Sequence, residues 1–431
     1  MAQTPKTIKR NCVIFAVVYL IVVGIPTVYN ASRSKSGQDY ASYHYAAEAV
    51  WSESSPFQVA NLNVHSRQDR TRKRVHPFFY PPPAVLFFLW SPFFALTTSF
   101  TIFVVLSNLC WLGTVWIMRK LTGASWKILA LIALFYTPVS DSMKMGQVNL
   151  CVLFLLLLAY QRSNGLLISL PAMIKMSPAL VVFQWLGAVR WKAVLMSGIG
   201  AIGLSLVTLF AVDFSEQLRF YTEIFPKFST GPYHGLTVPV SLPANHSIAD
   251  IWNQIWPGPL RVSGQGGFIG KTGIYELSQT GRLANSISTA CLFIVLCVTS
   301  FFKRDRQSQL ALFGLSCVIM TITPLYAYEH HLVFVAFPLV LSLHALERRI
   351  ISSKWIFVLG PSTICLAVPL FILRGVQKRM PEELSWFFQE SKFFALLGLG
   401  ACCLYLSLKG LKVLQVPSED SAHLQDSSNP E

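Results

Sequence analysis

The sequence predicts an all-α, polytopic membrane protein, and composition and hydropathy pattern carry that prediction. Of its 431 residues, 53% are hydrophobic and only 13% are charged, which is about half of the charged share in an ordinary soluble domain. A bilayer crossing needs about 20 mainly apolar residues, and we therefore expect about ten to twelve crossings, some of them short. The apolar runs are 12–28, 84–96, 101–118, 126–139, 150–160, 166–185, 193–214, 287–302, 310–324, 332–345, 355–373 and 393–408.

Basic residues near the ends of the apolar runs predict the orientation. Lys6, Lys9 and Arg10 precede the first run, which places the amino terminus inside by the positive-inside rule. The run resembles a signal peptide, but no small-residue cleavage site follows it, so we expect an uncleaved first span. The short basic segments 303–306 and 348–354 are expected on the cytoplasmic side as well.

This orientation divides the chain into four parts. It puts the longest polar connections outside the cell and leaves a polar carboxyl-terminal tail that is expected to be disordered and cytoplasmic. The expected parts are a membrane module 1–213 that includes outer loop 30–80, a large outer loop 214–284, carboxyl-terminal transmembrane helices 285–412, and the tail 413–431.

The middle of the chain allows two threadings. Counting each run between 81 and 185 as one crossing puts Gln147 inside. The other threading makes 81–118 a single net crossing and breaks 165–188 into a short hairpin around Lys175. We prefer the second threading because it obeys the positive-inside rule better, although its short helices require protein to cover their free backbone groups.

The sequence does not predict a metal site or a cofactor. All nine cysteines lie in or at the edge of apolar runs, where they are expected to pack as small apolar side chains. We find no CxxC motif and no His/Cys spacing typical of metal sites. The net charge of +15 is explained in part by cytoplasmic basic loops, and we expect membrane lipids rather than nucleic acid as the partner of the rest.

The first outer loop contains Asp39 at the start of a segment with helical spacing of Tyr43, Ala46, Ala47 and Val50. That spacing predicts an amphipathic helix lying in the membrane interface. An Asp at a helix start can simply cap free backbone N–H groups. Alternatively, Asp39 is a general base held at the membrane surface, able to accept a proton from a sugar hydroxyl.

A basic segment follows between His65 and His76 and includes Arg70 and Arg72. Such a segment is most often a solvated loop or a contact with anionic headgroups. Beside a catalytic helix it could instead bind the phosphate of a lipid substrate, because guanidinium groups form paired hydrogen bonds with phosphate. Tyr80 then precedes three prolines that suit the start of a helix.

Several polar residues stand inside or beside later apolar runs. Gln147 and Asn149 suit either a turn or the polar lining of a substrate groove. Lys175 has a proline on each side, and a lysine within a span is a functional candidate unless it snorkels to the interface. Glu329, His330 and His331 are adjacent; two neighbouring histidines point apart, so hydrogen bonding to a phosphate or sugar is favoured over a metal site.

Taken together, these segments resemble glycosyltransferase family 87, the polyprenyl-phosphate-mannose-dependent mannosyltransferases with the GT-C membrane fold. The resemblance covers roughly residues 10–350, and it rests on the order and spacing of motifs that are individually weak. The motifs are Asp39 with Tyr43, Tyr80-Pro81-Pro82, Gly146-Gln147-Val148-Asn149, Ile174-Lys175 with Pro178, Arg190-Trp191-Lys192, Asn245-His246-Ser247, and Thr323-Pro324 followed by His330-His331.

The resemblance implies inverting sugar transfer from a polyprenyl-phosphate donor to a lipid- or glycan-linked hydroxyl at the non-cytoplasmic face, in a bacterial inner membrane. Asp39 is implied as the general base. The residues implied to bind the donor phosphate are Lys175, His330, His331, Arg70 and Arg72. Those implied to bind substrate are Tyr43, Tyr80, Gln147, Asn149, Asn245, His246 and Glu329.

Two departures from the family pattern put the acceptor and the sugar in doubt rather than the fold. His246 stands where the family usually has Gln, and Tyr328 stands near a frequent Trp. The main alternative function is a transporter or flippase of a lipid-linked or small anionic substrate. That class predicts polar residues along a path through the bilayer, whereas the strongest candidates here gather towards one face.

Overall fold

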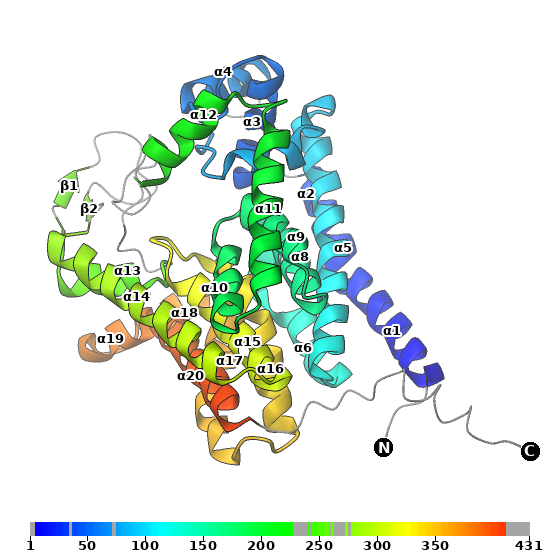
Figure 1. Ribbon diagram of the computed structural model, residues 1–431, viewed down its shortest axis with the longest axis vertical. Coiled ribbons are helices and arrows are strands. Elements are labelled where there is room, and N and C mark those ends of the chain that lie inside the picture. The colour runs from blue at the N-terminus through cyan, green and yellow to red at the C-terminus, as the bar shows by residue number, and fades with distance from the viewer. Residues whose placement is uncertain are drawn as a thin grey trace, which may run out of the picture.

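The computed structural model describes residues 5–33, 37–70, 75–226, 240, 244–258, 260–262, 272–274 and 277–410. This part of the chain is almost entirely helical, as Figure 1 shows. Its one regular exception is an antiparallel pair of three-residue strands, β1 (Leu260–Val262) and β2 (Thr272–Ile274), in which Arg261 lies opposite Gly273. The all-α membrane class predicted from composition is confirmed.

Six helical segments are long and apolar enough to cross a bilayer, and two bent pairs raise the number to eight if each pair is one span. Four shorter apolar segments remain, and length alone does not decide whether they cross; the expected ten to twelve crossings therefore stay a prediction. Four of the six are single helices: α5 (Leu96–Thr122), α11 (Trp191–Thr208), α14 (Gln279–Phe302) and α20 (Ser391–Lys409). The first span, Arg10–Arg33, runs through α1 (Pro5–Tyr19), a π turn (Leu20–Gly24) and α2 (Ile25–Arg33). The span Glu329–Glu347 consists of a 3-10 turn (Glu329–Val335) and α16 (Ala336–Glu347).

The bent pairs and the shorter helices fill the space between these spans. The bent pairs turn by 41° and 110°: α6 (Trp126–Phe135) with α7 (Thr137–Met145), and Ser353–Ala367, which contains α17 (Ile356–Ala367), with α18 (Leu370–Gln377). The remaining helices are α3 (Gln38–Trp51), α4 (Val59–Gln68), α8 (Asn149–Gln161), α9 (Gly165–Ile174), α10 (Leu180–Gly187), α12 (Phe214–Arg219), α13 (Ile248–Ile255), α15 (Arg306–Ile322) and α19 (Glu382–Gln389).

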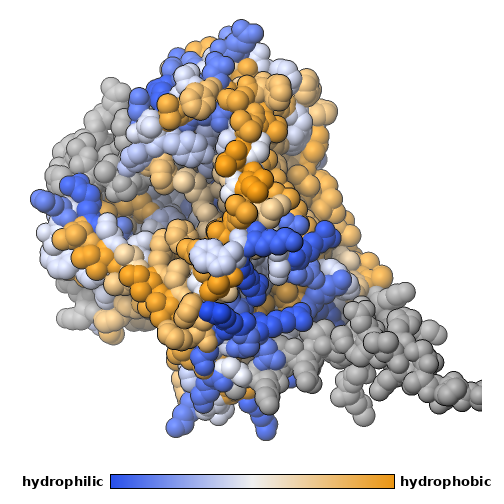
Figure 2. Space-filling model, in the orientation of Figure 1, coloured by the Kyte–Doolittle hydropathy of each residue, from blue (hydrophilic) through white to orange (hydrophobic). Residues whose placement is uncertain are grey.

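Helices on the outside of the bundle present apolar surface. Only 17% of the apolar window of α11 and 11% of that of α14 are buried, and hydrophobic residues dominate much of the face seen in Figure 2. The phenyl ring of Phe210, just after α11, is 94% exposed. A soluble protein would not leave such a surface to water, so these helices are expected to face lipid.

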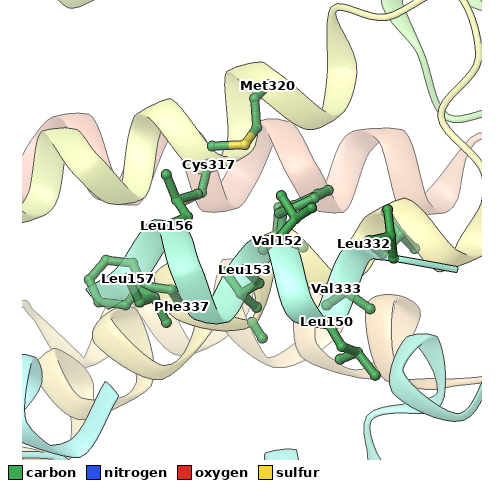
Figure 3. Close-up of a cluster of buried hydrophobic side chains, with 14 of the residues drawn as sticks. Leu150, Val152, Leu153, Leu156, Leu157, Cys317, Met320, Leu332, Val333 and Phe337 are labelled. Atoms are coloured by element: carbon green, nitrogen blue, oxygen red, sulfur yellow. The ribbon is translucent and has the colours of Figure 1, made fainter. Parts of the chain in front are cut away.

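The centre of the bundle lies around α15, in which every residue from 308 to 322 is buried. Figure 3 shows buried side chains of α8, α15 and the segment Glu329–Glu347, with Leu156 beside Cys317 and Leu157 beside Phe337. Interiors packed in this way transmit small displacements rather than absorbing them. The core therefore provides a rigid base for the polar residues at the ends of these helices.

The segment around Lys175 forms a hairpin, as the second threading predicts. Tyr160, which precedes α9, and Gln184, within α10, both donate hydrogen bonds to the Gln309 carbonyl, at 2.7 and 2.8 Å. The chain between them therefore leaves this level and returns to it, with Lys175 in between. Similarly, 3-10 turns at Pro82–Phe88 and Ser91–Phe93 precede the single long helix α5.

The helix expected in the first outer loop is present as α3, but protein covers it more completely than the amphipathic pattern predicts. Nine of its 14 residues are buried, including Tyr40 and Tyr45 on different sides. The reason is that α4, the Pro82–Phe93 turns, α5 and α7 all pack against α3. Figure 1 shows α3, α4 and α12 gathered at one end of the molecule, where α3 is a core element of the outer layer.

Candidate active site

Two glycines allow the start of α3 to dock against the turn between α7 and α8. Gly37 and Gly146 have φ values of +78° and +74°, a backbone region that favours glycine. The Gly37 amide donates to the Lys144 carbonyl at 3.1 Å. A Cβ atom at Gly146 would lie 2.5 Å from the Tyr40 Cβ. This close approach places the first turn of α3 beside Gln147.

Asp39 lies in that first turn, half-buried, with its carboxylate directed at Gln147. The N-cap of α3 is Gly37, so Asp39 does not occupy the capping position that its sequence context suggests. Its Oδ2 atom instead accepts a hydrogen bond of 2.7 Å from Gln147 Nε2. The interpretation of Asp39 as a helix cap is therefore wrong, because a glycine with a left-handed backbone begins the helix.

Two tyrosines orient the Gln147 side chain. Tyr43 donates to the Tyr80 hydroxyl at 2.6 Å, and the Tyr80 hydroxyl lies 3.2 Å from Gln147 Oε1. Burial raises the pKa of Tyr43 and of Tyr80 above the usual range, so both hydroxyls remain donors. Because Oε1 accepts from tyrosine, the amide nitrogen of Gln147 must face Asp39.

Lys175 and His330 approach the same carboxylate from distant parts of the chain. Lys175 Nζ donates to Asn149 Oδ1 at 2.7 Å, and Asn149 Nδ2 donates to the His330 carbonyl at 2.8 Å. Asp39 is close enough to both Lys175 and His330 to interact with them electrostatically. The structure thus brings together residues predicted from four separate segments, and we call Asp39, Gln147, Asn149, Lys175 and His330 the Asp39 cluster.

Glu329 and His246 lie in a second, more deeply paired group. Glu329 forms an ion pair with Lys392, and its other carboxylate oxygen is 2.8 Å from His246 Nε2. Lys392 is completely buried at the start of α20 and also donates to the Val368 carbonyl at 2.9 Å. The sequence analysis missed Lys392 because a lysine at the end of an apolar run reads as an interfacial flank.

Other predicted site residues have roles in holding the backbone. The Asn245 side chain bonds the backbone at Val240, Leu325 and Ala327, which leaves its amide fully used. His331 Nδ1 accepts from the Tyr328 backbone amide at 2.9 Å. These contacts fix the turn that carries His330. Contact of Asn245 or His331 with substrate stays a prediction.

Of the two arginines predicted to bind phosphate, the structure describes Arg70, which forms no hydrogen bond with the Asp39 cluster. Arg70 is exposed just after α4 and has a positive φ of 55°; the hydrogen bonds recorded for the Asp39 cluster do not include it. Arg72 lies outside the described residues. The guanidinium contribution to phosphate binding therefore remains a prediction.

The arrangement combines a proton acceptor with a site for an anion. Asp39 contributes one carboxylate oxygen that Gln147 does not engage, and Lys175 contributes an ammonium group held by a neutral amide. Facing a lysine, a lone carboxylate is a poor centre for a cation. The chemistry that fits is proton removal from one substrate and stabilisation of negative charge on another.

A comparison with known families decides the classification. The model of glycosyltransferase family 87 matches residues 78–326, more than half of the chain. The chain belongs to glycosyltransferase family 87. The range that matches family 87 includes Tyr80, Gln147, Asn149 and Lys175. Asp39 and His330 lie outside this range, and the tertiary structure places them beside the matched residues.

The chain is also similar to a protein whose name states an activity. The polyprenol-phosphate-mannose-dependent alpha-(1-2)-phosphatidylinositol pentamannoside mannosyltransferase of Mycolicibacterium smegmatis is 28% identical over 171 residues. The alignment covers 36% of this chain and 40% of that protein, so this family 87 chain spans less than half the length of the relative. No solved structure matches the chain significantly.

Proposed function

We propose that the protein transfers a sugar from a polyprenyl-phosphate donor to an acceptor hydroxyl, with inversion at the anomeric carbon. The observation that carries this proposal is the half-buried Asp39 carboxylate, hydrogen-bonded to the neutral Gln147 amide and within electrostatic range of Lys175 and His330. Membership of family 87 supports a glycosyltransferase. Neither a passive channel nor a structural bundle requires such an arrangement.

Asp39 is the general base in this proposal. Gln147 holds Oδ2 and leaves Oδ1 to accept the proton of the acceptor hydroxyl as its oxygen attacks the anomeric carbon. The new bond joins the acceptor oxygen to that carbon, and the bond to the phosphate oxygen breaks on the opposite side. A positioned base of this kind contributes about 10²–10⁴-fold to the rate.

Lys175 stabilises the leaving group. The polyprenyl phosphate gains negative charge as the glycosidic bond breaks, and an ammonium group that is held in place before the reaction can stabilise this charge with little rearrangement. Asn149 holds Lys175 Nζ at 2.7 Å and, through the His330 carbonyl, ties it to the Glu329–Glu347 segment. His330 is placed to donate a further hydrogen bond to the phosphate or to a sugar hydroxyl.

The choice of sugar and acceptor rests on the name of the relative, not on the geometry of the site. Its name specifies a polyprenol-phosphate-mannose donor and a phosphatidylinositol pentamannoside acceptor, so mannose and a mannosylated phosphoinositide are the first substrates to test. We further propose that the site faces the non-cytoplasmic side of a bacterial inner membrane, since the outer loop 30–80 supplies α3 and Asp39.

The test is transfer by the purified full chain in detergent. The donor is radiolabelled polyprenyl-phosphate mannose, and the acceptor is a phosphatidylinositol mannoside fraction. We expect Asp39→Asn to reduce transfer by about 10²-fold or more, whereas Asp213→Asn, at an exposed carboxylate before α12, should leave it unchanged. Transfer by Asp39→Asn at the wild-type rate would refute the base assignment. Counterflow of labelled donor in vesicles without product would favour a transporter.

A further inference from the structure

Two helices of the outer layer each carry a histidine and a carboxylate one helical turn apart. On α3 these are His44 and Glu48; on α4 and its C-cap they are His65 and Asp69. Residues separated by four positions lie on one face of a helix. The two helices pack against each other, and Figure 1 shows them together at one end of the molecule.

Each histidine lies near the carboxylate of the other helix. Glu48 Oε1 is 3.3 Å from His65 Nδ1. At the other end, His44 and Asp69, together with Glu48, offer ligand atoms that all lie within 4.8 Å of one another. Tetrahedral zinc with bonds near 2.0 Å requires ligand atoms to be about 3.3 Å apart. The Glu48–His65 separation already matches this value, and rotation of the side chains can supply the rest.

Hydrogen bonds hold the His44 ring in an orientation that suits a metal ligand. It is only 2% exposed, and its Nδ1 atom lies 3.0 Å from the Ser91 hydroxyl and 3.3 Å from that of Ser99. These hydroxyls commit Nδ1 and leave Nε2 for a metal, the arrangement in which an outer hydrogen bond fixes a ligating imidazole.

The charge balance also favours a cation here. Glu48 and Asp69 bring two carboxylates to the group, and both offer an oxygen atom within 4.8 Å of a ring nitrogen of His44. The alternative without a metal is an ion pair between His65 and Glu48 alone. That pair involves neither His44 nor Asp69. Asp69 Oδ2 accepts a hydrogen bond of 3.3 Å from the Tyr45 hydroxyl, and a shared divalent ion would use the Asp69 carboxylate as well.

We infer that His44, Glu48, His65 and Asp69 form a binding site for a divalent transition metal of the zinc class, which ties α4 to α3. The site lies outside the Asp39 cluster, and the proposal does not depend on the proposed reaction. Its consequence is structural: α3 carries Asp39 in its first turn, and the chain that leaves α4 returns to α3 at His76, which is 2.6 Å from Gln38.

Zinc binding to the full chain tests this inference. The purified protein is stripped with a chelator and titrated with Zn²⁺ by calorimetry, and the bound metal is counted by elemental analysis. We expect one saturable equivalent, with affinity at least about tenfold lower in Glu48→Gln and His65→Gln. The matched control is Glu347→Gln, because Glu347 also pairs with a histidine, His344, at 3.6 Å but lies outside the four-residue group.

A second measurement keeps the inference testable if the variants fold poorly. Co²⁺ added to the stripped wild-type protein should produce the intense visible absorption of a tetrahedral site, and Zn²⁺ should displace it. Thermal unfolding should shift upward with Zn²⁺ in the wild type and in Glu347→Gln but not in Glu48→Gln. Absence of saturable binding to the wild type, or equal affinity in Glu48→Gln and Glu347→Gln, would refute the site.

Discussion

Asp39 and Glu329 are both carboxylates within electrostatic range of His330, but their surroundings differ. Asp39 accepts a hydrogen bond from a neutral amide, Gln147. Glu329 is neutralised by the buried Lys392 and is bonded to His246 as well. A carboxylate that is directly paired with an ammonium group loses much of its ability to accept a proton, whereas a neutral donor orients the group and leaves it basic.

The comparison assigns different tasks to the two groups. Glu329 joins α20 to the turn that carries His330, and it does so with an ion pair whose lysine is completely buried. Asp39 keeps one oxygen available for a substrate. The Glu329–Lys392 ion pair therefore stabilises the fold. The Asp39 carboxylate, which accepts one hydrogen bond, takes part in the proposed reaction.

Removing the lysine of the ion pair gives the largest effect that we expect on stability. Lys392→Met leaves the Glu329 carboxylate without its cation in a buried position, which costs about 3–5 kcal/mol. Thermal unfolding in detergent measures the loss. The double variant Lys392→Met with Glu329→Gln should recover much of it, because no uncompensated charge remains. A double variant as unstable as the single one would show that packing, rather than charge, dominates at this position.

Lys175 should affect the reaction more than the fold. In Lys175→Met the leaving phosphate loses its ammonium partner, and we expect kcat to fall about a hundredfold. Thermal stability should change little, since the methionine fills similar space. Exposed Lys192, replaced by Met in the same way, is the control. If Lys175→Met retains kcat but unfolds at a lower temperature, Lys175 has the structural role that we assign to Lys392.

The smallest expected effect concerns the support of Asp39. Tyr80→Phe removes one donor to the Gln147 side chain, but the Tyr43 hydroxyl remains 3.3 Å from the same oxygen. Loss of a single hydrogen bond costs about 1 kcal/mol, so transfer should decrease by less than about tenfold. Tyr29→Phe, at an exposed position, serves for comparison. A decrease as large as that of Asp39→Asn would mean that Tyr80 contacts the substrate itself.

Sequence reasoning found most of the Asp39 cluster because its members are polar residues in unusual places. Asp39, Gln147 and Lys175 each interrupt or border an apolar run, and such exceptions are visible without a structure. Their shared location also followed from the predicted threading around Lys175.

What sequence reasoning could not find depends on tertiary contacts. Lys392 looks like an ordinary flank of an apolar run, and only packing of α20 against the Glu329 turn makes it a buried ion pair. The burial of α3 was missed for a related reason, since its alternating small and aromatic residues suit a helix buried on all sides as well as one at an interface. The spacing of His44 with Glu48, and of His65 with Asp69, was visible, but it gains meaning only once α3 and α4 are known to be neighbours.

The hairpin around Lys175 has a consequence for the way the protein is made. Its two ends are tied to the Gln309 carbonyl, which is synthesised 149 residues after Tyr160 and 125 residues after Gln184. During translation, the ribosome therefore delivers Lys175 to the membrane long before its anchor exists. Short helices without this anchor have unsatisfied or lipid-facing backbone groups. The hairpin therefore cannot adopt its final conformation until α15 has been inserted. The Asp39 cluster is therefore completed only late in biosynthesis.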